Sequence, residues 1–437
     1  MSHVFSRRTA GSLPVAVRAE GVWITDADGK RYLDAAGGAL VVNVGHGDGA
    51  IVRALTEQAE RLAYVHGTAF TTEVLEAYAD ELAPILPVDD PRIYPVSGGS
   101  EAVETALKVA RTYHLARGEG ERHVVIARWG SYHGNTLGAL DASGRGPLRE
   151  PYAPWLGRVH HVPPVYEYRC PLPGHPDGCG RAHADELDRA IRELGAETVA
   201  AFIAEPVVGA TLGAAAPPEE YWPAVRDVCD EHGVLLIADE VMTGFGRTGK
   251  WFGLDHWEVR PDILVAGKGA ASGHWPLGLC VASGEVYRTV REGGGFVHGF
   301  TASHHAVGAA VGRAVLRRLH EDKLVEAAQA RGELLLKALH DALDEHPLVG
   351  DVRGVGLMAG IELVRDRDTK EPFPREDRFT ERLTEAARDR GLLLYPSTGC
   401  VDGTNGDLVM LGPPFVISES ELAEAVDGLA EALQAVS

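Results

Sequence analysis

Short apolar runs that alternate with amphipathic segments are the feature that most constrains the fold of this chain. Between about residue 90 and residue 300 these runs are 93–96, 124–127, 199–204, 234–238, 263–266 and 279–282. The segments between them, for example 101–116 and 223–231, have the apolar spacing of helices. The alternation predicts a mostly parallel sheet with helices on both faces. We expect the strand at 279–282 to run antiparallel to the others.

The character of the sequence changes after about residue 305. An Ala/Leu/Arg/Glu-rich stretch at 306–345 predicts one long helix. A β-like stretch and two further helices are predicted after it, at 357–363, 376–390 and 419–435.

A chain of 437 residues exceeds one ordinary domain. We expect a large domain at 46–305 and a small α/β domain at 306–437, with the N-terminal segment 1–45 forming part of the small domain.

The composition excludes several classes of protein. A formal net charge of -21 argues against nucleic-acid binding, which needs a basic patch to neutralise phosphates. No stretch approaches the roughly 20 apolar residues of a membrane-spanning helix, and residues 1–8 lack the apolar core of a signal peptide. We therefore expect a cytoplasmic protein without a membrane partner.

The five cysteines do not form an obvious pattern. Cys170 and Cys179 flank His175 in the irregular Pro/Gly-rich segment 163–181, where a metal site is conceivable. A CxxC pair is absent, which favours a plain loop, so no metal is expected.

Asp239 and Lys268 follow closely after two of the apolar runs, 234–238 and 263–266. Ligands of open α/β sheets bind beyond the carboxyl ends of the strands, so both side chains should lie at one edge. A carboxylate and an amine placed there suit pyridoxal phosphate, which needs a lysine for its Schiff base and an acid for its pyridine nitrogen. Alone, each residue could be an ordinary loop residue.

Other polar groups follow neighbouring runs. The segment Ser97-Gly98-Gly99-Ser100-Glu101 follows 93–96 and opens a helix, whose free N–H groups and dipole can bind phosphate. An ordinary helix cap is the alternative. Glu205 follows 199–204, and Arg128 to Gly134 follow 124–127. Together these residues would place a phosphate site, an aromatic ring, two acids and a lysine at one edge, which indicates a cofactor site.

Five segments resemble class III aminotransferases. They are SGGSEAVETALKVAR (97–111), SYHGNTLGAL (131–140), AFIAEPVVG (201–209), LLIADEVMTGFGRTG (235–249) and AGKG (266–269). These enzymes use pyridoxal 5'-phosphate and have fold type I, and the resemblance extends from about residue 20 to residue 425. It implies an α/β fold with a mostly parallel seven-stranded sheet in a large domain and a smaller α/β domain.

The resemblance also implies roles for individual residues. Lys268 would bind the cofactor covalently and carry the substrate proton, and Asp239 would keep the pyridine nitrogen protonated. Tyr132 and Val241 would press on the two faces of the cofactor ring. Gly99 and Ser100 would hold the phosphate through backbone N–H groups.

Thr301 matches a threonine that reaches the phosphate of the neighbouring subunit. This match implies a homodimer with shared active sites, and a tetramer stays open.

The chain departs from the family pattern in its substrate pocket. In ω-amino-acid members of the family, a C-terminal arginine binds the carboxylate of the 2-oxo acid. A glutamate matching Glu205 masks this arginine when the amine donor is bound. In this chain Met410 stands at the position expected for the arginine. Either another arginine replaces it, or carboxylate recognition is weak. Leu40, His66 and Ala302 match positions that line the family's pocket, with interface packing as the alternative.

The leading hypothesis is transfer of an amino group from a primary amine or ω-amino acid to a small 2-oxo acid such as pyruvate. A pyridoxal-phosphate-dependent lyase, racemase or decarboxylating enzyme of the same fold is the alternative, because all of these share the lysine, the aspartate and the phosphate site. A non-catalytic binding protein of this fold predicts loss of Lys268 or Asp239, and both are present.

Overall fold

The computed structural model describes residues 3–7, 13–172, 174–175 and 178–437. Its central sheet has seven strands among these residues, in the order β4-β10-β9-β8-β7-β5-β6. The strands are Arg92–Val96 (β4), Gly278–Ala282 (β10), Ile263–Ala266 (β9), Leu235–Glu240 (β8), Val199–Ala204 (β7), Val124–Arg128 (β5) and Val159–Val162 (β6). β10 is antiparallel to both of its neighbours, and all other pairs of adjacent strands are parallel. The predicted mostly parallel sheet is therefore confirmed, as is the antiparallel direction of β10.

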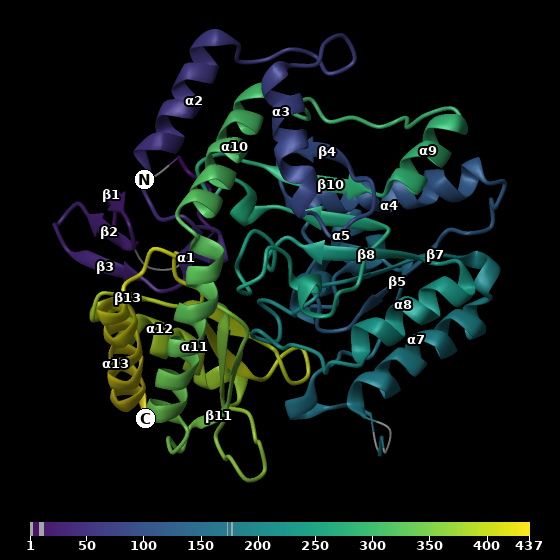
Figure 1. Ribbon diagram of the computed structural model, residues 1–437. Helices are drawn as coiled ribbons and strands as arrows, with labels where there is room; N and C mark the ends of the chain where they lie inside the picture. The colour runs from purple at the N-terminus through teal and green to yellow at the C-terminus, as the bar shows by residue number, and fades with distance from the viewer. Residues whose placement is uncertain (1–2, 8–12, 173, 176–177) are drawn as a thin grey trace.

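Helices cover both faces of this sheet (Figure 1). One face carries α7 (Cys179–Leu194) and α8 (Tyr221–His232), and the other carries α4 (Gly99–Ala116) and α9 (Gly284–Glu292). Side chains of successive strand residues point to opposite faces. Along β7, Phe202 and Ala204 accordingly pack with α7 and α8, whereas Ala201 and Ile203 pack with α4. Burial on both faces explains why β7 is an unbroken apolar run.

Two smaller sheets lie beside the large one. The first has the order β1-β2-β3-β13 and consists of Ala16–Glu20 (β1), Trp23–Asp26 (β2), Arg31–Asp34 (β3) and Leu392–Leu393 (β13). The second has the order β11-β12-β15-β14 and consists of Val349–Gly354 (β11), Ala359–Leu363 (β12), Asp407–Leu411 (β15) and Tyr395–Thr398 (β14). In the first sheet Leu33 of β3 pairs with Leu392 of β13, so the N-terminal strands join the C-terminal part of the chain.

The single long helix predicted at 306–345 is wrong, because two helices occupy this stretch. They are α10 (Ala306–Glu321) and α11 (Leu324–Leu343), and Lys323 between them adopts a left-handed backbone with φ 52° that no α-helix continues. The remaining helices are α1 (Gly37–Leu40), α2 (Gly49–Arg61), α3 (Glu73–Leu82), α5 (Leu137–Ala142), α6 (Gly146–Arg149), α12 (Phe379–Asp389) and α13 (Glu419–Val436). None of the helices in the described ranges has the length and apolar character that crossing a membrane requires.

Candidate active site

A cavity of about 440 Å³ lies at the carboxyl edge of the large sheet. Residues at or just beyond the ends of β4, β5, β7, β8 and β9 all reach it, which is where ligands bind in open α/β sheets. The lining residues are Val41, Ser97, Gly98, Gly99, Ser100, Tyr132, His133, Gly134, Glu205, Ala210, Asp239, Val241, Met242, Lys268, Gly273, Trp275, Pro276 and Leu277. The predicted meeting of Asp239, Lys268 and the glycine-rich segment is thus observed.

The glycine-rich segment forms the N-terminal end of α4. Gly98 is the N-cap residue, and no side chain caps the helix there, so its first backbone N–H groups lack a side-chain acceptor. A Cβ on Gly99 would lie 3.0 Å from the Val241 side chain, and a Cβ on Gly134 would overlap with Oγ of Ser100. Glycines at these two positions keep the cavity open around a helix end that favours anions.

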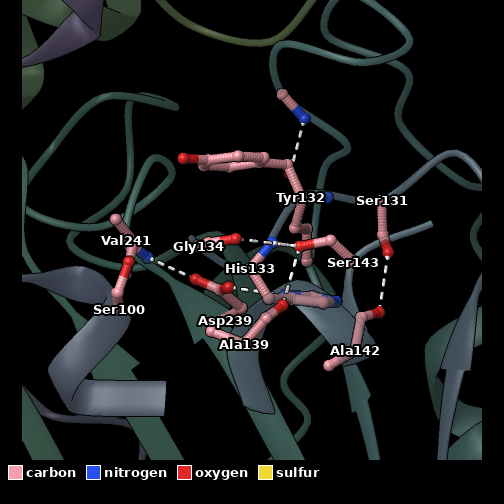
Figure 2. A network of polar contacts seen from close by, with 12 residues as sticks. Ser100, Ser131, Tyr132, His133, Gly134, Ala139, Ala142, Ser143, Asp239 and Val241 are labelled. Atoms are coloured by element: carbon pink, nitrogen blue, oxygen red, sulfur yellow. Dashed lines mark hydrogen bonds and ion pairs between the residues drawn. The ribbon is translucent and has the colours of Figure 1, made fainter. Parts of the chain in front are cut away.

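Asp239 is a buried carboxylate with two partners (Figure 2). Its Oδ2 lies 2.6 Å from Nδ1 of His133, and its Oδ1 accepts a hydrogen bond of 3.0 Å from the backbone N–H of Val241. The backbone N–H of His133 donates to Oγ of Ser143 at 2.8 Å, which fixes the loop that carries the imidazole. The Asp239 carboxylate is therefore held in one orientation from two sides.

Glu205 connects the loop after β7 to the loop after β5. Its Oε1 accepts a 2.9 Å hydrogen bond from the backbone N–H of Tyr132, and its Oε2 accepts a 2.8 Å bond from that of Gly209. Burial raises the pKa of this carboxyl, the charge of Asp239 adds to the rise, and the two backbone bonds oppose it. Glu205 thus positions the backbone of Tyr132 beside the cavity.

Lys268 occupies a strained backbone position at the end of β9. Its φ of 40° lies in the left-handed region, which residues with a side chain rarely adopt. A tight turn holds it there, because Ala270 N–H donates to the carbonyl of Gly267 at 2.8 Å and Ser272 N–H donates to that of Lys268 at 3.0 Å. Burial lowers the pKa of the Lys268 amine to about 8, although Glu205 and Asp239 favour the charged form. Roughly a tenth of this amine is therefore neutral, and nucleophilic, at pH 7, far more than for an ordinary lysine of pKa about 10.4.

The predicted pocket residues outside this cavity fall into two groups. Leu40 and Met410 are buried in an apolar cluster with Ala210 and Met242, two residues that also line the cavity.

His66, Thr301 and Ala302 are exposed in the single chain. Their two segments nevertheless lie side by side, since a Cβ on Gly67 would be 3.5 Å from the side chain of His304.

Several cavity residues had no predicted role, among them His133, Met242 and Trp275. His133 belongs to the recognised segment 131–140, but only the fold shows that it meets Asp239. Met242 lies three residues after Asp239 and resembles any core methionine in sequence. Trp275 belongs to an irregular segment after Lys268 and contacts the ring of His305 at a centroid distance of 5.0 Å. No sequence signal identifies Trp275.

Comparison with known proteins supports one family across the chain. The sequence model of the class III aminotransferases matches residues 5–433. The chain belongs to this family. It is 37% identical to the putrescine–pyruvate aminotransferase of Pseudomonas aeruginosa, with 94% of this chain and 88% of that protein covered.

Solved structures of transaminases match this aminotransferase closely. An (S)-enantioselective ω-transaminase from Thermomicrobium roseum is 40% identical with a TM-score of 0.92, covering 97% of this chain and 93% of the other. A PLP-bound amine transaminase from an uncultivated Pseudomonas species is 34% identical with a TM-score of 0.93, with both chains fully covered at 100%. The expected fold type I is therefore confirmed.

Class III aminotransferases use pyridoxal 5'-phosphate, and the cavity of this aminotransferase fits that group. The Lys268 amine suits its aldehyde, the fixed Asp239 carboxylate suits its pyridine nitrogen, and the open end of α4 suits its phosphate. The groups that suit the aldehyde, the pyridine nitrogen and the phosphate all lie in one cavity, and its lining includes Tyr132 and Val241.

Proposed function

We propose that this aminotransferase moves an amino group from a primary amine or ω-amino acid to a small 2-oxo acid such as pyruvate. The main observation behind this proposal is that Lys268, Asp239 and the N-terminal end of α4 all reach one cavity. The relative from Pseudomonas aeruginosa, named for putrescine and pyruvate, supports this substrate class.

Five cavity residues act on the cofactor ring or on the substrate proton in this proposal. Bound pyridoxal phosphate would supply an electron sink for the substrate carbon that loses a proton. Lys268 would attach the cofactor and then carry that proton, and Asp239, held by His133, would keep the pyridine nitrogen charged. Tyr132 and Val241 would hold the ring between them. This fixes the C–H bond that breaks, which is a positioning effect.

Gly99 and Ser100 complete the site in this proposal. Their backbone N–H groups at the start of α4 would bind the phosphate, as favoured by the helix dipole.

The preference for a small 2-oxo acid rests on Met410 and Glu205. Met410 is fully buried among apolar side chains, so the usual arginine has no counterpart at this position. Both Glu205 oxygens are already bonded to backbone N–H groups, so this carboxylate is satisfied without an arginine. Leu40, packed in the same cluster as Met410, would form part of the apolar pocket wall.

The exposed pocket residues support a homodimer, which we include in the proposal. Thr301 and Ala302 are exposed, and Val297 on the same segment has a relative exposure of 99%. Phe70, near His66, has a relative exposure of 66%. A second copy of the chain covering these segments would bury the apolar side chains and bring Thr301 to the partner's cofactor phosphate. The proposed cytoplasmic location rests on the sequence alone.

Half-reactions test the proposal. Given an amine alone, the holoenzyme should convert its cofactor to pyridoxamine phosphate and stop, and pyruvate should then restore the original absorbance. A lyase, racemase or decarboxylase would instead return to the starting spectrum without an acceptor. Lys268→Ala should abolish turnover, and borohydride reduction should no longer fix the cofactor to the protein. Full turnover by this variant would refute the assignment of Lys268 as the catalytic lysine.

A further inference from the structure

The segment that connects β6 to α7 brings two cysteines and two histidines together. The Sγ atoms of Cys170 and Cys179 lie 3.6 Å apart, and Nε2 of His183 lies 3.5 Å from Sγ of Cys170. A ligand atom of His175 lies within 4.8 Å of both cysteine sulfurs. We propose that Cys170, His175, Cys179 and His183 form a structural zinc site, separate from the cofactor cavity.

The distances from Cys170 to Cys179 and to His183 match those between ligands of tetrahedral zinc. With Zn–S of about 2.3 Å and Zn–N of about 2.0–2.1 Å, neighbouring ligand atoms lie roughly 3.5–3.8 Å apart. A disulfide would need the two sulfurs about 2.0 Å apart and would give the histidines no role. Both cysteines are free thiols in the structure. Two thiols and two imidazoles are a common ligand set of closed zinc sites.

His183 is the residue that the fold adds to the sequence pattern. It lies one helical turn after Cys179 on α7, so both side chains are on the same face. His183 has a relative exposure of 3%, and its Nε2, 3.5 Å from Sγ of Cys170, is the ring nitrogen that would bind the metal. A sulfur is only a weak hydrogen-bond partner, so zinc at Nε2 would give this buried imidazole a stronger contact than the thiol does.

The location gives the metal a structural role. The segment that carries Cys170 also contacts the second small sheet, because Nε of Arg169 donates to Glu362 at 2.6 Å and the Arg353 guanidinium donates to the Tyr166 hydroxyl at 3.0 Å. Zinc would hold this segment against α7, which packs on one face of the large sheet. Because the four ligands close the coordination sphere, no open position is left for catalysis.

Metal analysis of the untagged holoenzyme tests the site. We expect about one equivalent of zinc per chain, as for a single four-ligand site. Cobalt exchanged into the protein should give the tetrahedral d–d bands in the red, where pyridoxal phosphate does not absorb. A protein without zinc after incubation with zinc chloride would overturn the proposal. So would a denatured protein with two fewer titratable thiols than its five cysteines, since that result means a disulfide.

Matched variants locate the metal. Cys179→Ser and the milder His175→Gln should lose zinc and lower Tm by several degrees, with the amine half-reaction retained. Cys229→Ala removes a buried cysteine of another cluster and should keep zinc. His232→Gln alters a second group of potential ligands, Asp188, Glu231 and His232, and should also keep zinc. Retention of zinc by both Cys179→Ser and His175→Gln would refute the site.

Discussion

The imidazole of His133 meets the carboxylate of Asp239 across a buried contact of 2.6 Å. Removing the imidazole leaves one buried carboxylate oxygen without this partner, which costs about 1–3 kcal/mol of free energy. His133→Ala should therefore lower kcat about ten- to 100-fold. Steady-state kinetics measure this effect. Exposed His123→Ala is the control, and equal behaviour of the two variants would contradict a positioning role.

The lowered pKa of Lys268 predicts how the apoprotein takes up its cofactor. Because burial lowers this pKa to about 8, the neutral amine fraction increases as the pH rises through that value. The initial rate of covalent cofactor uptake, followed by absorbance, should increase with pH and have its midpoint near pH 8. A midpoint near the ordinary lysine value of about 10.4 would contradict the burial of this amine.

The same pKa shift has a consequence for apoprotein stability. Between about pH 8 and the unfolded value of about 10.4, the unfolded chain binds more protons at this lysine than the folded chain. The free energy of unfolding should therefore increase with pH in this window relative to Lys268→Met, and urea titrations at several pH values measure the difference.

Gly134 tests the phosphate end of the cavity. Gly134→Ala combines a strained φ of 133° with a Cβ that overlaps Oγ of Ser100. Gly157→Ala is a matched control, because Gly157 has a φ of 115° but nothing within 4 Å of the added Cβ. Both variants should lose about 1 kcal/mol of stability from the strained backbone. Only Gly134→Ala should weaken cofactor binding, by tenfold or more in a fluorescence titration.

Arg145 is the candidate that replaces the arginine missing at Met410. Burial raises the pKa of the Tyr132 hydroxyl, and the charges of Arg7 and Arg145 oppose the rise, so both cations act electrostatically on a residue that lines the cavity. Arg145→Gln should raise KM for pyruvate about tenfold and leave KM for a simple amine unchanged. Exposed Arg158→Gln should change neither value. An equal change in both KM values would argue against carboxylate recognition by Arg145.

Val297 tests the proposed dimer. A charge on this exposed apolar side chain should weaken an interface that covers it, so Val297→Asp should dissociate into monomers at low concentration and lose activity in parallel. Sedimentation measures the mass of the particle. Leu115→Asp on α4, where Leu115 has a relative exposure of 51%, is the control for an exposed apolar position. A wild-type protein that is monomeric and fully active would contradict the shared site.

The sequence was most informative for strands that are buried on both faces, where almost only apolar residues occur. Continuous apolar runs predicted β7, β8 and β9, because strands covered on both faces contain few polar residues. β6 was missed since His160 and His161 interrupt its apolar pattern. Seven strands of the two smaller sheets were missed as well, namely β1, β2, β3, β11, β13, β14 and β15. Strands such as β1 and β14 contain exposed or polar residues, so they lack a continuous apolar run.

The candidate site shows the same division. Asp239, Lys268 and Ser97 to Ser100 were predictable because each follows a recognisable strand. The contact of His133 with Asp239 and the turn that strains Lys268 depend on packing that no local pattern encodes. The break at Lys323 between α10 and α11 was missed because lysine is a common helix residue, and only its left-handed backbone ends the helix.

The pairing of β3 with β13 affects how the chain can fold during synthesis. Arg31–Asp34 leaves the ribosome early, but Leu392–Leu393 follows about 360 residues later, after roughly 20–70 s at ordinary rates of translation. Until then β3 has an unpaired edge that can template wrong partners. Nascent chains of this aminotransferase should therefore depend on chaperones that shield strands, and truncation before β13 should cause aggregation rather than a smaller folded protein.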